Sequence, residues 1–185
     1  MAEITAHSSL QEVAAIISQA LVAHGVDATL SGGAAVSIYT DNRYQSHDLD
    51  FVSTVGINTL ARVVNKLGFV VTPSRRLFAH PESQWLLEFP SGPLGFGNRV
   101  VDTSSLQTLE TPYGPLRVIP PTLCVMDRLA AFVHWRDRQC LEQAIWVAQS
   151  HAIDWDDLRS WANQEGMSEA DWQSFHSNAT AQNGG

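Results

Sequence analysis

Hydrophobic residues recur at helical spacing near the start of the 185-residue chain and again after about residue 120. In residues 10–23 they lie three and four positions apart, which predicts an amphipathic helix. Ser8 or Ser9 is placed to cap this helix, and Gly25 to end it. The same periodicity predicts helices over residues 34–39, 58–67, 123–135, 138–149, 155–165 and 168–175.

Short apolar runs bounded by glycine, proline or polar residues predict β-strands among these helices. The expected strands cover residues 28–30, 47–53, 69–72 and 85–89, with a hairpin over residues 106–119. Strands and helices therefore mix up to residue 120, and helices alone follow. This order predicts an α/β or α+β core in residues 1–120 and a helical part in residues 121–176. Residues 177–185 are small and polar, so we expect a disordered tail.

Composition narrows the classes of function. Acidic residues outnumber basic ones by 19 to 11, and the formal net charge is -8. This balance argues against general affinity for duplex DNA or for anionic membranes. No apolar run approaches the roughly 18 residues of a membrane span, and the polar start lacks a signal-peptide pattern, so we expect a cytoplasmic protein. Cys124 and Cys140 lie among apolar neighbours and are expected to be buried thiols.

Asp48 and Asp50 lie one residue apart within an apolar strand pattern that includes Leu49 and Phe51. Alternation along a strand places both carboxylates on the same face. Two carboxylates on a half-buried face repel each other unless a cation compensates them. Oxygen ligands suit Mg²⁺ or Mn²⁺, so the pattern favours a metal site. A paired structural role is the alternative.

Gly32 and Gly33 lie between a predicted strand and a predicted helix. Glycine allows the backbone to approach a phosphate closely, and a helix N-terminus favours negative charge. Ser31 adds a hydroxyl to this turn. A tight turn without any ligand is the alternative, and the GxxxxGK[ST] phosphate-loop pattern is absent from the sequence.

Glu88 is a third acid in an apolar strand pattern. If its strand lies beside that of Asp48 and Asp50, three carboxylates meet and are able to hold two Mg²⁺ ions with a nucleoside triphosphate. One of the acids is then placed to act as a base. The alternative is an edge-strand Glu88 that faces solvent, with Asp102 as the substitute third acid.

The Gly-Gly turn, the helix and the following S-x-D-L-D-F strand together resemble the nucleotidyltransferase superfold of polymerase-beta-type enzymes. The closer resemblance is to minimal nucleotidyltransferases and to AbiEii-type toxins. It implies an α+β fold with a mixed sheet, flanking helices and a C-terminal helical part. It also implies that Gly32 and Gly33 bind triphosphate, that Asp48 and Asp50 bind metal, and that Glu88 is the third acid.

Outside the core motif, the sequence both matches the family and departs from it. Arg43 and Ser46 match the arginine and serine that precede the acids in the family. The family's lysine in the first C-terminal helix is missing, since Lys66 is the only lysine of the chain. Arginine also pairs with phosphates, so an arginine of the helix junction is the candidate substitute. The candidates are Arg128, Arg136 and Arg138, with a junction locked by Arg–Asp pairs as the alternative.

These features predict an Mg²⁺-dependent transfer of a nucleoside monophosphate from an NTP to an acceptor hydroxyl. The acceptor is open: a small molecule, an RNA or a protein. A groove of arginines would suit a nucleic acid, and its candidate members are Arg75, Arg76, Arg136 and Arg138. Two alternatives remain open: a binding or regulatory protein with weak or no activity, toxin–antitoxin-related, and a metal-dependent hydrolase that uses the same acids.

Overall fold

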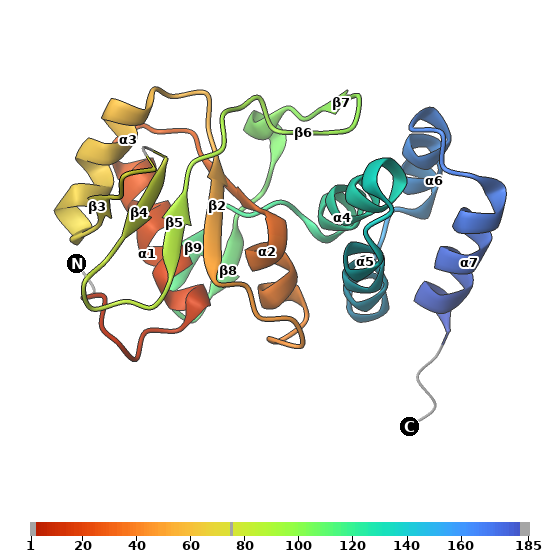
Figure 1. Ribbon diagram of the computed structural model, residues 1–185, viewed down its shortest axis with the longest axis horizontal. Coiled ribbons are helices and arrows are strands. Elements are labelled where there is room, and N and C mark those ends of the chain that lie inside the picture. Colours follow the sequence, from red (N-terminus) through yellow and green to blue (C-terminus); the bar gives the residue numbers. More distant parts are fainter. Residues whose placement is uncertain (1–2, 75, 182–185) are drawn as a thin grey trace.

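A five-stranded sheet organises the first part of the protein (Figure 1). The computed structural model describes residues 3–74 and 76–181. The strand order is β1-β2-β5-β4-β3, with β2 and β5 parallel and the other neighbours antiparallel. These strands are β1 (Thr29–Ser31), β2 (Asp48–Val52), β3 (Val70–Val71), β4 (Leu77–Ala79) and β5 (Leu86–Glu88). The mixed sheet with flanking helices confirms the predicted α+β class.

Two small hairpins follow the sheet in the chain. They are formed by β6 (Gly95–Phe96) with β7 (Arg99–Val100), and by β8 (Leu109–Thr111) with β9 (Gly114–Leu116). The second hairpin was predicted from its turn residues. The strands β4, β6 and β7 were not predicted, because two or three residues carry too little periodicity to be recognised.

The helices flank the sheet and then form the C-terminal part. In Figure 1, α2 lies between the sheet and the C-terminal helices. Ser9 caps α1, since its Oγ accepts a hydrogen bond from the Glu12 backbone N–H at 3.1 Å. The helices are α1 (Leu10–Ala23), α2 (Gly32–Tyr39), α3 (Ile57–Val64), α4 (Pro121–Trp135), α5 (Arg138–Ser150), α6 (Trp155–Gln164) and α7 (Glu169–Thr180), with short 3-10 turns η1 (Asn65–Leu67) and η2 (Thr103–Ser105).

The residues at the N-termini of the C-terminal helices explain where these helices begin. Proline at the first position of α4 fits a helix start, because the ring presets φ and the lost N–H has no helical partner there. Asp137, Asp154 and Ser168 cap α5, α6 and α7 with side-chain oxygens. One continuous cluster of buried apolar side chains joins these helices to the sheet. The helix α4 begins at Pro121, two residues before the predicted start at residue 123. A division into separate domains stays a prediction.

The last helix is longer than the sequence pattern indicated. It continues to Thr180, with Ala179 buried. Residues 177–180 are therefore helical and do not belong to the predicted disordered tail. Residues 182–185 lie outside the described residues. In the part of the chain that the structure describes, no helix combines the length and apolarity needed to cross a membrane.

Candidate functional site

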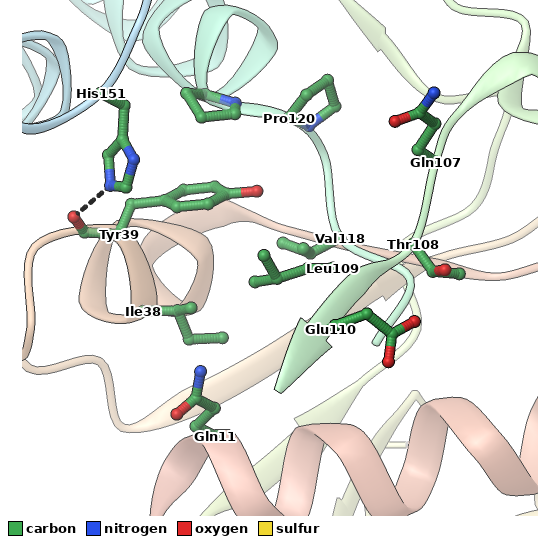
Figure 2. A pocket seen from close by; sticks show the side chains of 11 residues that line it. Gln11, Ile38, Tyr39, Gln107, Thr108, Leu109, Glu110, Val118, Pro120 and His151 are labelled. Carbon is green, nitrogen blue, oxygen red and sulfur yellow. Dashed lines mark hydrogen bonds between the residues drawn. The ribbon is translucent and has the colours of Figure 1, made fainter. Parts of the chain in front are cut away.

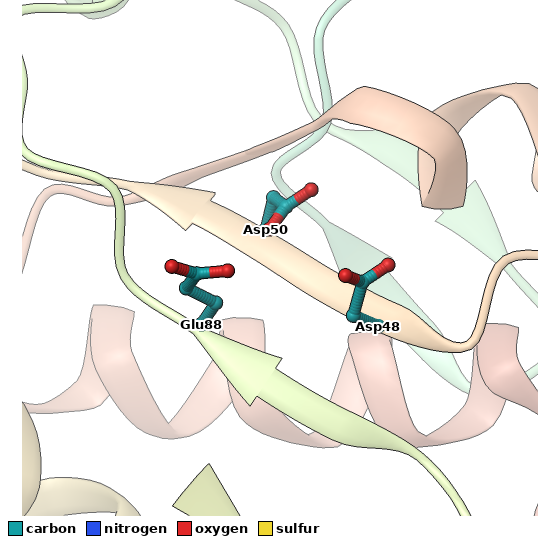
Figure 3. A group of neighbouring side chains, drawn as sticks. All are labelled: Asp48, Asp50 and Glu88. Carbon is teal, nitrogen blue, oxygen red and sulfur yellow. The ribbon is translucent and has the colours of Figure 1, made fainter. Parts of the chain in front are cut away.

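Three carboxylates converge on adjacent strands, as Figure 3 shows. Asp48 and Asp50 stand on β2, and Glu88 stands directly opposite Asp50 on the parallel neighbour β5. An oxygen from each carboxylate lies within 4.8 Å of an oxygen from each of the others. The alternating residues Leu49 and Leu87 are fully buried, which fixes the acids on the opposite face of the sheet.

The pKa of Asp50 is raised by its surroundings. Burial and, to a smaller extent, the charges of Asp48 and Glu88 together raise the pKa of Asp50 to about 7, while the charge of Arg128 lowers it. Among the described residues, no side-chain or backbone donor is hydrogen-bonded to the Asp50 carboxylate. The protein thus gathers negative charge here and leaves it largely uncompensated.

Asp48 is held in place by the loop before its strand. The Ser46 hydroxyl donates to Asp48 Oδ1 at 2.9 Å and to the Asp48 carbonyl at 3.0 Å. The Ser46 backbone N–H donates to Ser37 Oγ at 2.9 Å, and that hydroxyl donates to the Gly33 carbonyl at 3.1 Å. This chain of bonds ties α2 to the start of β2, so the helix and the first acid have a fixed relation.

Gly32, the first residue of α2, lies against the acids. Its φ is +68°, a left-handed value that glycine adopts without strain. A Cβ at this position would lie 2.6 Å from Asp50 Oδ2, so the close approach also excludes a side chain. The Gly32 N–H donates to Asp127 Oδ2 at 3.1 Å, which brings α4 to the same point.

Two of the three acids, Asp50 and Glu88, line a cleft of about 350 Å³. One wall contains Ser31 and Gly32, and another contains Asp127 and Arg128 of α4. The segment after β5 forms the third wall, with Pro90, Ser91, Pro93, Leu94, Gly95 and Phe96. The cleft therefore brings carboxylates, a helix N-terminus and a cation together in one open hollow.

The β6–β7 hairpin at this third wall is anchored to the C-terminal helices. The Asn98 N–H donates to Glu165 at 2.7 Å, and Arg99 pairs with Asp157 at 2.9 Å. The Trp161 indole N–H donates to the Phe96 carbonyl at 3.1 Å. The helical part thus fixes a wall of the cleft, although it contributes none of the three clustered acids.

Of the other predicted site residues, one lines the cleft and the others lie outside its lining. Ser31 is buried and lines the cleft. Gly33 lies instead beneath Tyr44 and Ser46, which a Cβ would meet at 2.9 and 3.1 Å. Arg43 stacks on the Trp146 ring of α5, with its guanidinium carbon 4.5 Å from the ring centroid. Ser46 acts on Asp48, as described above.

Asp102, the substitute third acid, lies apart from the cluster. It caps η2, and its Oδ1 accepts bonds from the Ser104 N–H at 3.0 Å and the Ser104 hydroxyl at 2.6 Å. These bonds lower its pKa, as expected for a capping carboxylate. Glu88, by contrast, does not face away from the acids as the edge-strand alternative required.

The arginines of the expected groove line different hollows. Arg76 donates to the Phe89 carbonyl at 3.0 Å beside the N-terminus of α3. Arg136 and Arg138 line a hollow between α4, α5 and α7, where Arg136 pairs with Asp171 at 2.9 Å. Arg75 lies outside the described residues. Of the three phosphate-binding candidates, the acid cleft contains Arg128.

A second hollow of about 390 Å³ lies around Tyr39 (Figure 2). The His151 ring nitrogen hydrogen-bonds the Tyr39 carbonyl at 2.7 Å, and Ile38, Leu109 and Val118 supply apolar walls. This hollow contains one carboxylate, from Glu110, and none of the clustered acids. The acid cleft is therefore the candidate functional site.

Asp127 and the segment 90–96 are the parts of the site that sequence reasoning did not assign. Asp127 and Arg128 are neighbours within a predicted helix. Nothing in the local sequence indicates that Asp127 contacts Gly32, which lies 95 residues earlier in the chain. The Gly- and Pro-rich run after Glu88 was visible as a loop, and its place beside the acids depends on the path of the folded chain.

Comparison with known proteins supports the fold. The search against protein-family models and the search of curated proteins give no match. Among solved structures, the chain is similar to an antigenic nucleotidyltransferase-like protein from Paracoccidioides brasiliensis. The TM-score is 0.61 at 14% identity, over 92% of this chain and 93% of that one.

A second solved structure has the same general architecture. It is the antibiotic-resistance factor ANT(2'')-Ia, with a TM-score of 0.51 at 14% identity, over 90% of this chain and 96% of that chain. At this identity the likeness concerns the fold alone. The chain has a nucleotidyltransferase-type α+β fold.

Proposed function

We propose that this protein is a metal-dependent nucleotidyltransferase that moves a nucleoside monophosphate from an NTP to an acceptor hydroxyl. The observation that carries the proposal is the three-carboxylate cluster directly beside the N-terminus of α2. A metal site next to a phosphate-binding helix end suits a nucleotide carried with its cation.

The donor set fits Mg²⁺ or Mn²⁺. All three groups are carboxylates, which are hard oxygen ligands, and their spacing allows shared ligation. The pKa of Asp50 is raised first by burial and then by the charges of Asp48 and Glu88, and a divalent cation would compensate these charges. When bound, Mg²⁺ would supply charge neutralisation for the triphosphate and for the departing pyrophosphate.

Different residues would bind the metal and the phosphate groups. Asp48, Asp50 and Glu88 would hold the metal, with Ser46 orienting Asp48. The backbone at Gly32 would donate to a phosphate oxygen, beside Ser31. We assign Arg128 to the phosphate groups because it is the arginine of the cleft.

The reaction forms a bond from the acceptor oxygen to the α-phosphorus and breaks the bond from that phosphorus to the bridging oxygen of pyrophosphate. Glu88 would accept the proton of the acceptor hydroxyl. NTPs are abundant in the cytoplasm, in agreement with the location expected from the sequence. The nature of the acceptor, and a toxin–antitoxin-related role, remain hypotheses from the sequence resemblance.

Incubation with α-labelled ATP, CTP, GTP or UTP and Mg²⁺ tests the proposal. We expect the wild type to label an acceptor from a cell extract fractionated into small molecules, RNA and protein, and Asp48→Asn and Asp50→Asn to lose the label. Glu88→Gln is compared with Asp102→Asn, which neutralises the rejected third acid. Loss with Glu88→Gln alone supports the assigned cluster.

The other outcomes separate the rival functions. Release of labelled nucleoside monophosphate without acceptor labelling would indicate a hydrolase. NTP binding without turnover would indicate a binding or regulatory protein. Equal labelling by wild type and Asp50→Asn would contradict the proposed function.

A further inference from the structure

The backbone donor at the start of α2 already has an anionic partner within the protein. The Gly32 N–H donates to Asp127 Oδ2 at 3.1 Å, and Arg128 Nη2 donates to the same oxygen at 2.7 Å. A single carboxylate oxygen therefore uses both the helix-end donor and the cation of the cleft. A carboxylate oxygen that accepts from a helix N-terminus and an arginine makes the same interactions as a phosphate oxygen would make there.

Arg128 also retains unused donor capacity. Its side chain is 16% exposed, and its Nε is buried without a hydrogen-bond partner among the described residues. A buried guanidinium donor without an acceptor is costly. Arg128 and Asp127 both line the cleft, so an anion that displaced the Asp127 oxygen would meet the Arg128 Nη2 donor there.

Asp127 lines the same cleft as Asp50 and Glu88, so its negative charge adds to theirs. It therefore opposes a phosphate in two ways. It holds the donors that the phosphate would use, and it adds negative charge to the cleft.

We propose that Asp127 is a resident anion that competes with the nucleotide's phosphates for Gly32 and Arg128, and that it thereby limits nucleotide affinity. This inference rests on the proposed function for the location of the phosphates. Binding requires the Asp127 oxygen to leave both donors. The apparent affinity is therefore reduced in proportion to the fraction of molecules in which it has left, and it is low when that fraction is small. This competition favours pyrophosphate and triphosphate over monophosphate. Displacing Asp127 costs free energy, and only a ligand with several negative charges offsets that cost.

Titration calorimetry with pyrophosphate at a fixed excess of Mg²⁺ tests this without any turnover. We expect Asp127→Asn, which keeps the shape and removes the charge, to bind pyrophosphate about tenfold more tightly than wild type. Arg128→Gln should bind it more weakly. The matched control is Asp171→Asn, because Asp171 pairs with Arg136 at 2.9 Å away from the acid cleft, and it should leave the affinity unchanged.

A second measurement separates displacement from a simple change of charge. In wild-type protein labelled with ¹³C and ¹⁵N, addition of Mg²⁺-pyrophosphate should shift both the Gly32 amide and the Asp127 carboxylate resonances. Urea unfolding checks that the variants are folded. If Asp127 only tied α4 to α2, Asp127→Asn would lose stability without gaining affinity, and that result would overturn the inference.

The two proposals fail in different experiments. Tighter pyrophosphate binding by Asp127→Asn with no nucleotidyl transfer by wild type would support the resident anion and contradict the proposed reaction. Transfer by wild type with equal or weaker pyrophosphate binding by Asp127→Asn would do the reverse. Absence of pyrophosphate binding in both proteins would also overturn the resident anion.

Discussion

Two acidic regions of this protein differ in what surrounds their carboxylates. In the C-terminal part, the Glu165 side chain is only 1% exposed, but it accepts from the Asn98 N–H at 2.7 Å and lies 3.1 Å from His134 Nε2. In the cleft, Asp50 has two carboxylate neighbours and a raised pKa.

The difference separates a buried acid with hydrogen-bond donors around it from acids whose nearest charged neighbours are other acids. Glu165 has donors that replace water, so its burial is compensated and it holds the β6–β7 hairpin against the helices. The cleft acids repel one another, so the folded protein carries a local electrostatic cost there. Burial alone does not indicate function; the partners of the buried group do.

The largest expected effect concerns activity. If the protein acts as proposed, Asp50→Asn should lower the rate of nucleotidyl transfer roughly a thousandfold, because the proposed metal site would lose a ligand. Glu165→Gln should retain most of the activity in its folded fraction. Initial rates with labelled NTP, corrected for the folded fraction by circular dichroism, make the comparison. A similar loss in both variants would break the distinction between the two regions.

The next effect concerns the pH dependence of stability. In metal-free protein the pKa of Asp50 is about 7, against an unfolded value of 3.8. Between these values the folded state binds more protons than the unfolded state, so the free energy of unfolding falls as pH rises from about 4 through 7. At pH 8, Asp50→Asn should be more stable than wild type by on the order of 3 kcal/mol.

Urea unfolding in EDTA at pH 4.5 and pH 8 measures this gain, which should fall to about a quarter at the lower pH. Added Mg²⁺ should stabilise the wild type at pH 8 and reduce the difference. The control is Asp171→Asn, whose carboxylate has a pKa lowered by the hydrogen bond from Arg136 and should give no gain at pH 8. An equal gain there would contradict the electrostatic explanation.

Glu165 should respond in the opposite direction. Glu165→Gln turns one oxygen acceptor into a donor facing His134 or Asn98, so the free energy of unfolding should fall by about 2 kcal/mol. Glu169→Gln is the matched control, because its carboxylate is 62% exposed. Urea unfolding at pH 7 gives both values, and a stabilised Glu165→Gln would remove the contrast with Asp50.

The smallest effect compares two glycines with nearly equal backbone angles. Gly25 has φ +67° with open space around it, whereas Gly32 has φ +68° and would bring a Cβ to 2.6 Å from Asp50 Oδ2. Each alanine should cost about 1 kcal/mol for the left-handed conformation. Gly32→Ala should also weaken Mg²⁺-pyrophosphate binding in calorimetry, and Gly25→Ala should not. Equal binding by both would show that the close approach at Gly32 is unimportant.

Much of the fold could be predicted from local pattern. The bounds of α1 agree with the predicted residues 10–23, and those of α5 differ from the prediction by one residue at the end. Such helices are long enough for periodicity and caps to define them. The two-residue strands β6 and β7 could not be predicted, because their pairing depends on the turn at Gly97 and Asn98 and on contacts with α6.

The candidate site divides in the same way. The sequence by itself determined that Asp48 and Asp50 share a face, because alternation is a local property. It placed the Gly32-Gly33 turn before a helix at residue 34, whereas α2 already begins at Gly32. Only the tertiary structure decided that Glu88 lies opposite Asp50, because strand register depends on the packing of the whole sheet. It also decided that Asp127 and Arg128 reach the Gly32 N–H, since a contact across 95 residues exists only once α4 packs against α2.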